Sequence, residues 1–468
     1  DNKRFQIGNF SGGPGSSVTP DFKKAGGKPE VVRTLAVNQS IDATFAGRLN
    51  DANNNRSLGL TKTGGATLEL THPGSEYSGP TMIRGGTLRI SGAGRLNHRP
   101  APRDPPRLGF YPGKIVNEAQ LHWDSSATQE LSGILSGSGR IVKSNTGFLT
   151  LSGDASAFTG DLLVEEGRLI LNASFGGRIA LGANAALGGH GNIGGALITA
   201  PESSLILSGG ATTTALSAHG ATIANPTYIE FACPQQDGVV YEVIEYGAGQ
   251  LRQYQHFVPL ARGSLSHDVK QRKVFFTAEA PGTRTWSGGD GDWDSLKVKR
   301  NWVEDDRVFY QGDQVIFGPT TSDTTITLDG LLAPGSVTVT HPDHTYTFAG
   351  SDRGGLAGKG SFTKSSTGTV QIASKSPYYT GLTRIEAGVF RLVEGGAWGT
   401  GPIRNEANLE VDSDANLSLI NPIAGSGTLT KRGAGALTLG GPGESIFTGD
   451  VIVASGTIIL DKPSALGT

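Results

Sequence analysis

The side chains that could cleave a polysaccharide are mainly acids, and this sequence scatters them. Hydrolysis of a glycosidic bond needs two carboxyl groups held at a set separation on one face. The two acidic pairs, at residues 165–166 and 305–306, fall at expected turns, and adjacent residues of a strand face opposite ways. No Gly-x-Ser-x-Gly, His-Glu-x-x-His or phosphate-binding motif occurs. The sequence therefore predicts no catalytic residues and no enzymatic activity.

The best candidate for a metal site is a run of alternating acids. Asp290, Asp292 and Asp294 supply the hard oxygen ligands that Ca²⁺ prefers. The downstream glutamate and the glycine of a calcium loop are not at the expected offsets, so the prediction is no metal and no cofactor, with Ca²⁺ as the alternative. The single cysteine, Cys233, excludes an intramolecular disulfide and is expected to pack in the core. His341 and His344 flank a proline turn and are expected at the surface.

Residues 97–113 could carry an interaction site. Five prolines in this stretch prevent a central strand and predict a loop that leaves the wall of the fold. Loops on rigid scaffolds often carry function, and basic and aromatic side chains could meet an anionic glycan or a neighbouring subunit. A solvated loop is the alternative. The residues concerned are Arg99, Arg103, Arg107, Phe110 and Tyr111.

Composition indicates an all-β protein without a nucleic-acid partner. Seventy of the 468 residues are glycine, about twice the average share of about 7%, and glycines alternate with short β-branched runs. The 40 basic and 42 acidic residues give a formal net charge of −2, so no basic face is expected. No apolar stretch approaches the ~20 residues of a transmembrane helix. The chain opens Asp-Asn-Lys-Arg, which predicts a processed form or a fragment.

Four segments of the chain repeat one pattern. The first contains Leu60-Thr-Lys-Thr-Gly-Gly-Ala-Thr-Leu-Glu-Leu70, then Tyr77-Ser-Gly79, then Gly86-Thr-Leu-Arg-Ile90. From its lysine to its aromatic residue the spacing in the four copies is 15, 15, 15 and 16 residues, and from the aromatic to the later glycine it is nine in each. Such constant spacing indicates stacked turns of one solenoid.

Strand periodicity assigns the repeat positions a structural role. Each strand is three to five residues long and turns at glycine or asparagine, so it cannot bury a core alone, whereas strands stacked about 4.8 Å apart can. The aromatics are expected to stack at corners beside the glycine two residues later. The repeat lysines are expected on the outer face as a solvated ladder, the alternative being a ligand-binding row; they are Lys62, Lys143, Lys364 and Lys431. The scaffold positions are Tyr77, Gly79, Gly86, Phe158, Gly160, Gly167, Tyr379, Gly381, Gly388, Phe447, Gly449 and Gly456.

These residues resemble a known family. The pattern Leu-Thr-Lys-x-Gly-x-Gly-x-Leu-x-Leu, followed by Tyr/Phe-Thr-Gly and Gly-x-Leu, is similar to the passenger-associated, or autotransporter-associated, β-strand repeat, and residues 422–460 match it best. The resemblance implies a secreted, right-handed parallel β-helix (a β-solenoid) with Gly-rich turns and loop insertions, of the kind that bacteria use as surface stalks and adhesins. The segment from Trp286 to Trp293, with Trp302, is similar to the start of a new block in such proteins, which implies that Trp293 and Trp302 are packing residues.

The expected organisation has three parts. Residues 1–35 form an N-terminal arm or leader, residues 36–282 a first β-helix block closed by the strand at 241–246, and residues 283–468 a second block. The fourth repeat stops at Thr468 without a polar cap, so an uncapped C-terminal end is expected. Such an end, or the N-terminal arm, could stack on another copy and grow an open filament.

Three hypotheses for function remain open at this point. The favoured one is an extracellular or cell-surface structural protein of bacteria that self-assembles into a filament or surface layer, with itself as partner. The second is an adhesin passenger fragment in which the 97–113 loop or the lysines bind glycan or a host surface. The third is a polysaccharide-cleaving β-helix.

Overall fold

The structure is a computed structural model that divides the chain into two compact units. It describes residues 4–20, 32–52, 57–97, 109–207, 216–231, 236–295, 299–350, 354–376, 378–441 and 445–466. The N-terminal unit comprises Asp1–Glu230, Val240–Pro259 and Leu265–Thr277. The C-terminal unit comprises Phe231–Val239, Leu260–Ser264 and Ala278–Thr468. Cys233 and the arginines at 99, 103 and 107 lie outside the described residues.

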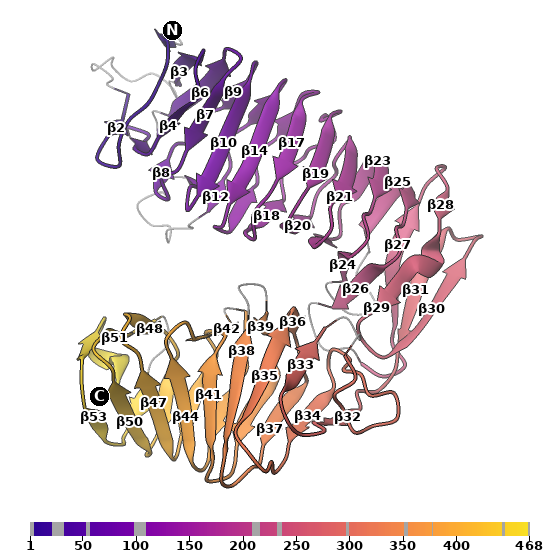
Figure 1. Ribbon diagram of the computed structural model, residues 1–468. Coiled ribbons are helices and arrows are strands. Elements are labelled where there is room, and N and C mark those ends of the chain that lie inside the picture. The colour runs from indigo at the N-terminus through magenta and orange to yellow at the C-terminus, as the bar shows by residue number, and fades with distance from the viewer. Residues whose placement is uncertain are drawn as a thin grey trace. The chain divides into compact units, whose positions relative to one another are not determined.

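Three parallel walls build the N-terminal unit (Figure 1). The first wall ends at β16 (Leu135–Ser136), after which successive strands alternate between the second and third walls. The first wall is a sheet of β1 (Arg4–Ile7), β3 (Arg33–Asn38), β6 (Leu58–Thr63), β9 (Thr81–Ile83), β13 (Ile115–Asn117) and β16 (Leu135–Ser136). The second wall holds β4 (Ala43–Phe45), β7 (Thr67–Leu70), β10 (Thr87–Gly92), β14 (Gln120–Ser125), β17 (Arg140–Lys143), β19 (Asp161–Val164), β21 (Arg178–Leu181), β23 (Asn192–Ile198), β25 (Leu216–Thr222) and β27 (Val240–Tyr246).

The third wall starts as two short pairs and continues as an eight-stranded sheet. The pairs are β2 (Ser17–Val18) with β5 (Arg48–Leu49), and β8 (Ser75–Glu76) with β11 (Leu96–Asn97). The sheet contains β12 (Phe110–Tyr111), β15 (Gln129–Leu131), β18 (Phe148–Leu151), β20 (Gly167–Leu171), β22 (Ala185–Gly189), β24 (Ser203–Leu207), β26 (Thr227–Phe231) and β29 (Phe257–Pro259). The described part of the leader pairs within the chain, because β1 is in parallel register with β3 and β2 with β5.

The second wall ends in antiparallel strands. Strand β27, which the sequence suggested as a closing strand, pairs in parallel with β25 and in antiparallel with β31 (Lys273–Ala278). The sheet order then continues to β30 (Gly263–Asp268), while β28 (Leu251–Arg252) pairs with β25. The change of direction ends the parallel stacking in this wall.

The C-terminal unit repeats the three-walled plan. Its first wall is β32 (Thr283–Thr285), β34 (Gln314–Phe317), β37 (Ser336–Val339), β40 (Ser361–Lys364), β43 (Thr383–Ile385), β46 (Ile403–Asn405), β49 (Ile423–Gly425) and β52 (Ile446–Phe447). Its second wall is β33 (Gly291–Asp294), β35 (Thr324–Asp329), β38 (Thr345–Gly350), β41 (Thr369–Ala373), β44 (Val389–Val393), β47 (Asn408–Asp412), β50 (Thr428–Arg432) and β53 (Val451–Val453). Its third wall is β36 (Leu331–Leu332), β39 (Gly355–Leu356), β42 (Lys375–Ser376), β45 (Ala397–Trp398), β48 (Leu417–Leu419), β51 (Ala436–Leu439) and β54 (Thr457–Leu460).

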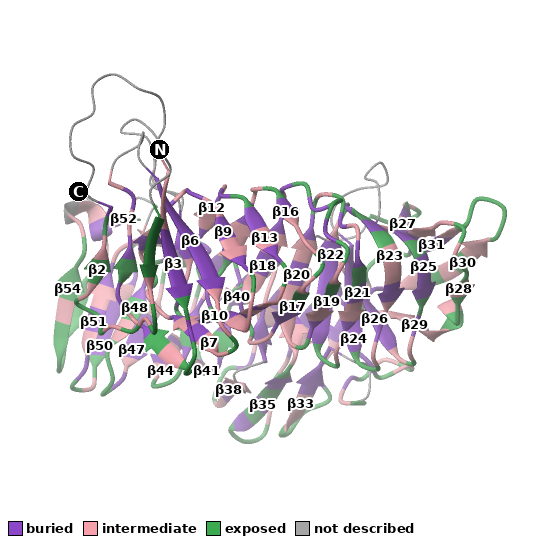
Figure 2. Ribbon diagram, turned by 90° about the horizontal axis from the view of Figure 1, so that it is seen from above, coloured by how far each residue is buried: buried purple, intermediate pink, exposed green. Residues whose placement is uncertain are grey.

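The core lies between the walls because alternate side chains of each strand face inward. Along β35 the six residues alternate buried and exposed, and Figure 2 shows the same alternation in both units. The strands pair in register, so each inward residue sits on the equivalent residue one turn away. Trp123, for example, is paired with Lys143, and Lys143 with Val164. One turn therefore takes 20 or 21 residues at this point of the N-terminal unit.

Aromatic side chains fill the start of the C-terminal unit. Trp293 and Trp302 are at most 1% exposed, as the resemblance implied for packing residues, and their ring centroids are 5.6 Å apart at 80°. Trp286 meets Trp302 edge to face at 5.2 Å, and Phe317 lies 5.6 Å from Trp286. Edge-to-face contact of this kind favours the electrostatics of the ring systems. The cluster gives the short first strands of this unit a large apolar surface to bury.

The predicted all-β parallel β-helix is thus confirmed. The described residues contain no α-helix, and their only helical elements are the 3₁₀ turns η1 (Tyr254–His256) and η2 (Pro463–Ala465). No helix in this part of the chain is long and apolar enough to cross a lipid bilayer.

The last described turn of the C-terminal unit leaves apolar side chains uncovered. Strands β53 and β54 each have one described strand neighbour, β50 and β51 respectively. Val453 is 51% exposed, Ile459 47% and Leu460 48%. Val453 and Leu460 pair with Lys431 and Leu439 one turn earlier, and each of these is 1% exposed, whereas Ile459 pairs with the half-buried Thr438. Elsewhere in the wall, the following turn of the stack covers such side chains and buries them.

Candidate functional site

The four repeat lysines are buried, so the predicted outer ladder is wrong. The Lys62 ammonium Nζ donates to the carbonyl oxygens of Thr63 and Gly64 in its own turn, both at 2.9 Å, and to that of Gly85 in the next turn at 2.8 Å. The lysine therefore joins two successive turns at a corner where the walls meet, and it supplies a donor to backbone carbonyls of both turns. The four side chains that are at most 1% exposed are Lys62, Lys143, Lys364 and Lys431.

Lys143 makes the same connection in the second repeat. Its Nζ donates to the carbonyl oxygens of Ser144 at 2.9 Å and Asn145 at 2.5 Å, and to that of Glu166, one turn on, at 3.2 Å. Burial lowers the pKa of Lys143 to about 8, against the opposing effect of the Glu166 carboxylate. The cost of removing the ammonium from water is met at this corner by three carbonyl oxygens.

The lysines of the third and fourth repeats lie at the same kind of corner. Lys364 donates to the carbonyl oxygen of Ser366 in the turn that follows its strand, and burial lowers its pKa to about 8. Lys431 donates to the carbonyl oxygen of Gly433 at 2.8 Å and to that of Ser413, one turn earlier, at 3.4 Å. In these repeats, too, the charge is directed at backbone of the corner rather than at solvent.

The later glycine of each repeat shares the corner with the lysine. At Gly167 a Cβ would lie 2.9 Å from the Lys143 Nζ and 2.4 Å from the Asn145 carbonyl oxygen, and at Gly456 it would lie 2.9 Å from the Lys431 Nζ. The constant spacing of lysine and glycine in sequence thus places them together, one turn apart. The φ angles are +61°, +78°, +70° and +76° at Gly86, Gly167, Gly388 and Gly456, a region that disfavours side chains.

The aromatic and the nearby glycine of each repeat also pack as scaffold. The aromatic side chains are 0%, 0%, 1% and 8% exposed at Tyr77, Phe158, Tyr379 and Phe447. Two residues after each aromatic, a Cβ would come within 2.3, 1.8, 1.8 and 1.7 Å of a carbonyl oxygen of the preceding turn, at Gly79, Gly160, Gly381 and Gly449. These glycines allow the backbones of two turns to touch, so all twelve scaffold positions serve packing.

The loop at 97–113 is closed at its base by buried polar groups. The Asn97 Oδ1 accepts a hydrogen bond from the Gly109 N–H at 2.6 Å, and Gln129 Nε2 donates to the Gly109 carbonyl at 2.8 Å. Tyr111 is fully buried and joins a hydroxyl chain with Thr81, so it faces the core rather than a partner. Phe110 is half-buried. The three arginines expected to bind a glycan lie outside the described residues.

The three alternating acids of the calcium candidate are engaged with the protein itself. Asp290 Oδ1 accepts the Thr325 N–H at 2.6 Å, Asp292 Oδ2 lies 3.0 Å from the Lys299 Nζ, and Asp294 Oδ1 accepts the Lys299 N–H at 3.2 Å. Within the described ranges, no group of three or more His, Cys, Asp or Glu side chains is placed to hold a metal ion. The acids therefore act as contacts between the first turns of the C-terminal unit.

A second charged cluster lies at the same turns. Arg284 is 2% exposed, and its guanidinium contacts Asp313 at 2.9 Å and Asp306 at 2.5 Å. Arg262 contacts the other oxygen of Asp313 at 2.9 Å and lies 4.4 Å from the centre of the Tyr310 ring. The hydrogen bond from Arg284 holds the pKa of Asp306 below its ordinary value. Buried charges that are paired in this way are consistent with a structural role.

His341, expected at the surface, is in fact buried. Its ring lies 4.7 Å from the Tyr346 ring, and its Nε2 is 3.1 Å from the Thr369 carbonyl oxygen. Burial lowers the pKa of His341 to about 4. The His344 side chain, by contrast, is 37% exposed.

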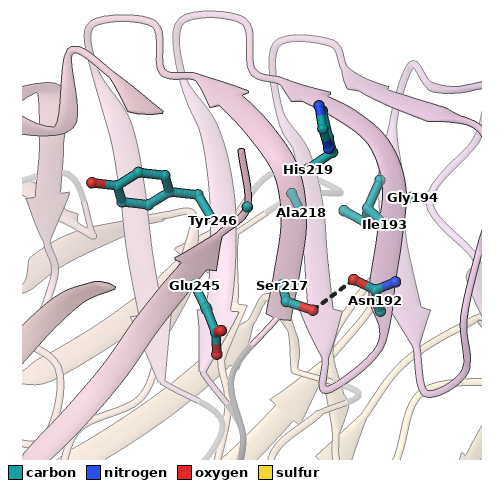
Figure 3. A pocket seen from close by; sticks show the side chains of 9 residues that line it. Asn192, Ile193, Gly194, Ser217, Ala218, His219, Glu245 and Tyr246 are labelled. Atoms are coloured by element: carbon teal, nitrogen blue, oxygen red, sulfur yellow. Dashed lines mark hydrogen bonds between the residues drawn. The ribbon is translucent and has the colours of Figure 1, made fainter. Parts of the chain in front are cut away.

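The outer face of the second wall carries a hollow that the sequence did not reveal. It has a volume of about 350 Å³ and spans the edges of β23, β25 and β27 (Figure 3). Ser217 Oγ donates to Asn192 Oδ1 at 2.9 Å across two strands. The register of β23 and β25 shifts between Ile193 and Ala196, which marks a bulge. The lining residues are Asn192, Ile193, Gly194, Ser217, Ala218, His219, Glu245, Tyr246 and Gly247.

The repeats match a described family. Residues 60–90, 141–171, 362–392 and 424–460 match the passenger-associated-transport-repeat, and these are the four segments recognised in the sequence. The chain is also similar to the adhesin BmaC autotransporter of Brucella suis biovar 1 (strain 1330), with 30% identity over 183 residues. That alignment covers 37% of this chain and 5% of the adhesin, so the chain spans a small part of the relative's length. No solved structure matches.

The comparisons and the fold agree. Each matched segment lies inside the three-walled stack and supplies a buried lysine, a buried aromatic residue and two closely packed glycines. The matches are to passenger and adhesin proteins rather than to a class of enzyme. The chain is a parallel β-helix in which four segments match the passenger-associated-transport-repeat, and part of it is similar to an autotransporter adhesin.

Proposed function

We propose that this chain is the shaft of an adhesin passenger displayed on the bacterial surface. The observation that carries the proposal is that all four passenger repeats lie in the stacked walls, and that three of their lysines, Lys62, Lys143 and Lys431, join successive turns. Within each unit, the pairing of strands through the stack and the buried ammonium groups at the corners resist local opening. A rigid shaft holds its outer faces away from the membrane, where they can contact another surface.

Display on a non-adherent laboratory bacterium tests this proposal. The chain is placed between a signal peptide and a translocator, and the control is the same vector without the chain. We expect an antibody to reach the chain on intact cells and the cells to bind an epithelial monolayer several-fold better than the control. Cells that display the chain but bind no better than the control would contradict an adhesive role.

Self-assembly into a filament or surface layer is the second candidate. Its support is the apolar last described turn, in which Val453 and Leu460 are about half exposed although their partners one turn earlier are buried. Stacking this turn on another copy would bury those side chains in a head-to-tail contact, which grows without closing. Electron microscopy of the concentrated protein should then show fibres, and the variant Val453→Lys with Leu460→Lys should remain dispersed. Monomers at every concentration would exclude this mode of assembly.

A further inference from the structure

The hollow on the second wall of the N-terminal unit presents polar groups from three neighbouring strands. Asn192, Ser217 and Glu245 are partners in register on β23, β25 and β27, so they form one row along the direction of stacking. Adjacent strands lie about 4.8 Å apart, and the row therefore offers an amide, a hydroxyl and a carboxylate at regular intervals. In Figure 3 the three side chains project from neighbouring strands beside the hollow.

Small residues keep the hollow open between these groups. Gly194 lies within the bulge of β23, Ala218 lies on β25, and Gly247 directly follows β27. The bulge and the missing side chains together leave room for a bound molecule on an otherwise closed face.

Aromatic side chains flank the hollow on the side of β27. Tyr246 lines it, and its hydroxyl lies 2.9 Å from the His267 Nε2. The Tyr254 ring lies 4.5 Å from the His267 ring, which extends the aromatic surface. All three rings are partly exposed. Tyr246 is the register partner of Ala218 rather than of Ser217, so these rings border the hollow and the hydroxyl, amide and carboxylate of the row supply its hydrogen-bonding groups.

The charge of the hollow is largely compensated. The Glu245 carboxylate lies 3.3 Å from the Lys273 Nζ, and that ammonium also contacts Glu242 at 2.8 Å. A strongly cationic ligand would compete with Lys273, and a strongly anionic one would meet two carboxylates. The arrangement therefore favours a neutral ligand with many hydroxyl groups.

We propose that this hollow is a binding site for a neutral oligosaccharide, whose sugar units lie along the Asn192–Ser217–Glu245 row. The site deepens the adhesin function proposed above and rests on it, because it gives that function a ligand class and a place. The ligand runs along the stacking direction, so that consecutive hydroxyls meet consecutive strands.

The test uses the whole chain and two matched tyrosine variants. Ser217→Tyr fills the hollow with a ring, whereas Ala180→Tyr puts the same ring on the outer side of β21 in the same wall, outside the lining residues. Tetrasaccharides of β-1,4-linked glucose, α-1,4-linked glucose and β-1,4-linked N-acetylglucosamine serve as probes. Binding is followed by saturation-transfer NMR and by isothermal titration calorimetry, with circular dichroism to check the fold.

We expect at least one probe to bind the wild-type chain, Ser217→Tyr to weaken its binding by about tenfold or more, and Ala180→Tyr to change it by less than about twofold. Glu245→Ala, which removes a rim group without adding bulk, should also weaken binding and replaces Ser217→Tyr if that variant fails to fold. No binding of any probe, or equal binding by the hollow variants and Ala180→Tyr, would overturn the proposal.

The outcome for the site can be separated from the outcome for the adhesin function. Cells that display Ser217→Tyr are compared with cells that display the wild-type chain in the adhesion assay. If the purified chain binds no probe while wild-type and variant cells adhere equally, the hollow is excluded and the adhesin function stands. If displayed wild-type cells do not adhere, the adhesin function fails whatever the purified chain binds.

Discussion

Replacing Lys143 by methionine should destabilise the N-terminal unit by about 2–4 kcal/mol. The Lys143 Nζ donates to three carbonyl oxygens, and a buried polar group left without a partner costs about 1–3 kcal/mol. Two effects keep the total below the sum of three such costs. A carbonyl can adjust toward other donors through its second lone pair, and the variant no longer has to bury an ammonium group. Methionine preserves most of the apolar volume of the lysine side chain. The loss of unfolding free energy therefore measures the contribution of the contacts between the ammonium group and the carbonyl oxygens.

The effect should be local as well as global. Amide hydrogen exchange followed by mass spectrometry should show faster exchange in peptides that cover 140–171, where the corner joins two turns, and a lowered denaturant midpoint for the N-terminal unit. Lys114→Met is the control, because Lys114 is exposed in the same unit. A surface substitution of this kind usually changes stability by less than about 0.5 kcal/mol.

The reasoning would be refuted by equal behaviour of the two variants. If Lys143→Met unfolds at the same denaturant concentration as Lys114→Met, the corner carbonyls do not depend on the ammonium. Faster exchange throughout the unit, without a maximum at 140–171, would mean that the lysine supports folding by some means other than the corner contacts.

Three further predictions follow from the same packing. Gly160→Ala should destabilise the chain by at least about 2 kcal/mol, because a Cβ would come within 1.8 Å of a carbonyl oxygen, whereas Gly65→Ala, with nothing within 4 Å, should be nearly neutral in thermal melts. The folded-state pKa of His341 is about 4, below its ordinary 6.5, so on acidification the unfolded chain binds the proton first. The unfolding free energy should therefore fall as the pH is lowered from 6.5 to 4. His341→Gln should flatten that dependence in urea titrations. The folded-state pKa values of Lys143 and Lys364 are about 8, below the ordinary 10.5, so their protonation in the unfolded chain disfavours folding below pH 8. The unfolding free energy should therefore rise with pH above 8. A wild-type curve that stays flat from pH 8 to about 9.5 would contradict this prediction.

The sequence predicted the architecture because the repeats encode it locally. The nine-residue interval from Tyr77 to Gly86 recurs in each copy, and it spans the distance from one corner to the next in the folded stack. The aromatic residue must fill a corner and the glycine must adopt a positive φ, so both positions can be recognised without knowledge of the rest of the fold.

The prediction that the lysines lie on the outer face is wrong because the strand period, rather than the charge, decides which face of the strand a side chain occupies. In Leu60-Thr-Lys62 the lysine is two residues from a buried leucine and therefore on the same face of the strand. A lysine is rarely buried unless its ammonium finds partners, and those partners are carbonyl oxygens of turns whose position depends on the next turn of the stack. The tertiary context, rather than the residue type, decides the outcome.

The hollow on the second wall could not be found from sequence for a related reason. Its row joins Asn192, Ser217 and Glu245, which are 25 and 28 residues apart and meet only through the stacking of turns. One local signal was present, since Gly194 and Gly195 interrupt a strand and glycine pairs in strands often mark a bulge. That signal indicates where the wall is irregular but not which side chains surround the irregularity.

The four lysine corners are staggered, because the two lysines of each unit lie on different walls. Lys62 stands on the first wall of the N-terminal unit and Lys143 on the second, and the C-terminal unit repeats the offset with Lys364 and Lys431. Within each unit, the lysine contacts therefore occur at different corners. Local unfolding that starts at the corner of one wall meets another wall whose lysine contacts are still intact. Resistance to opening is therefore shared among the walls instead of depending on a single line of bonds.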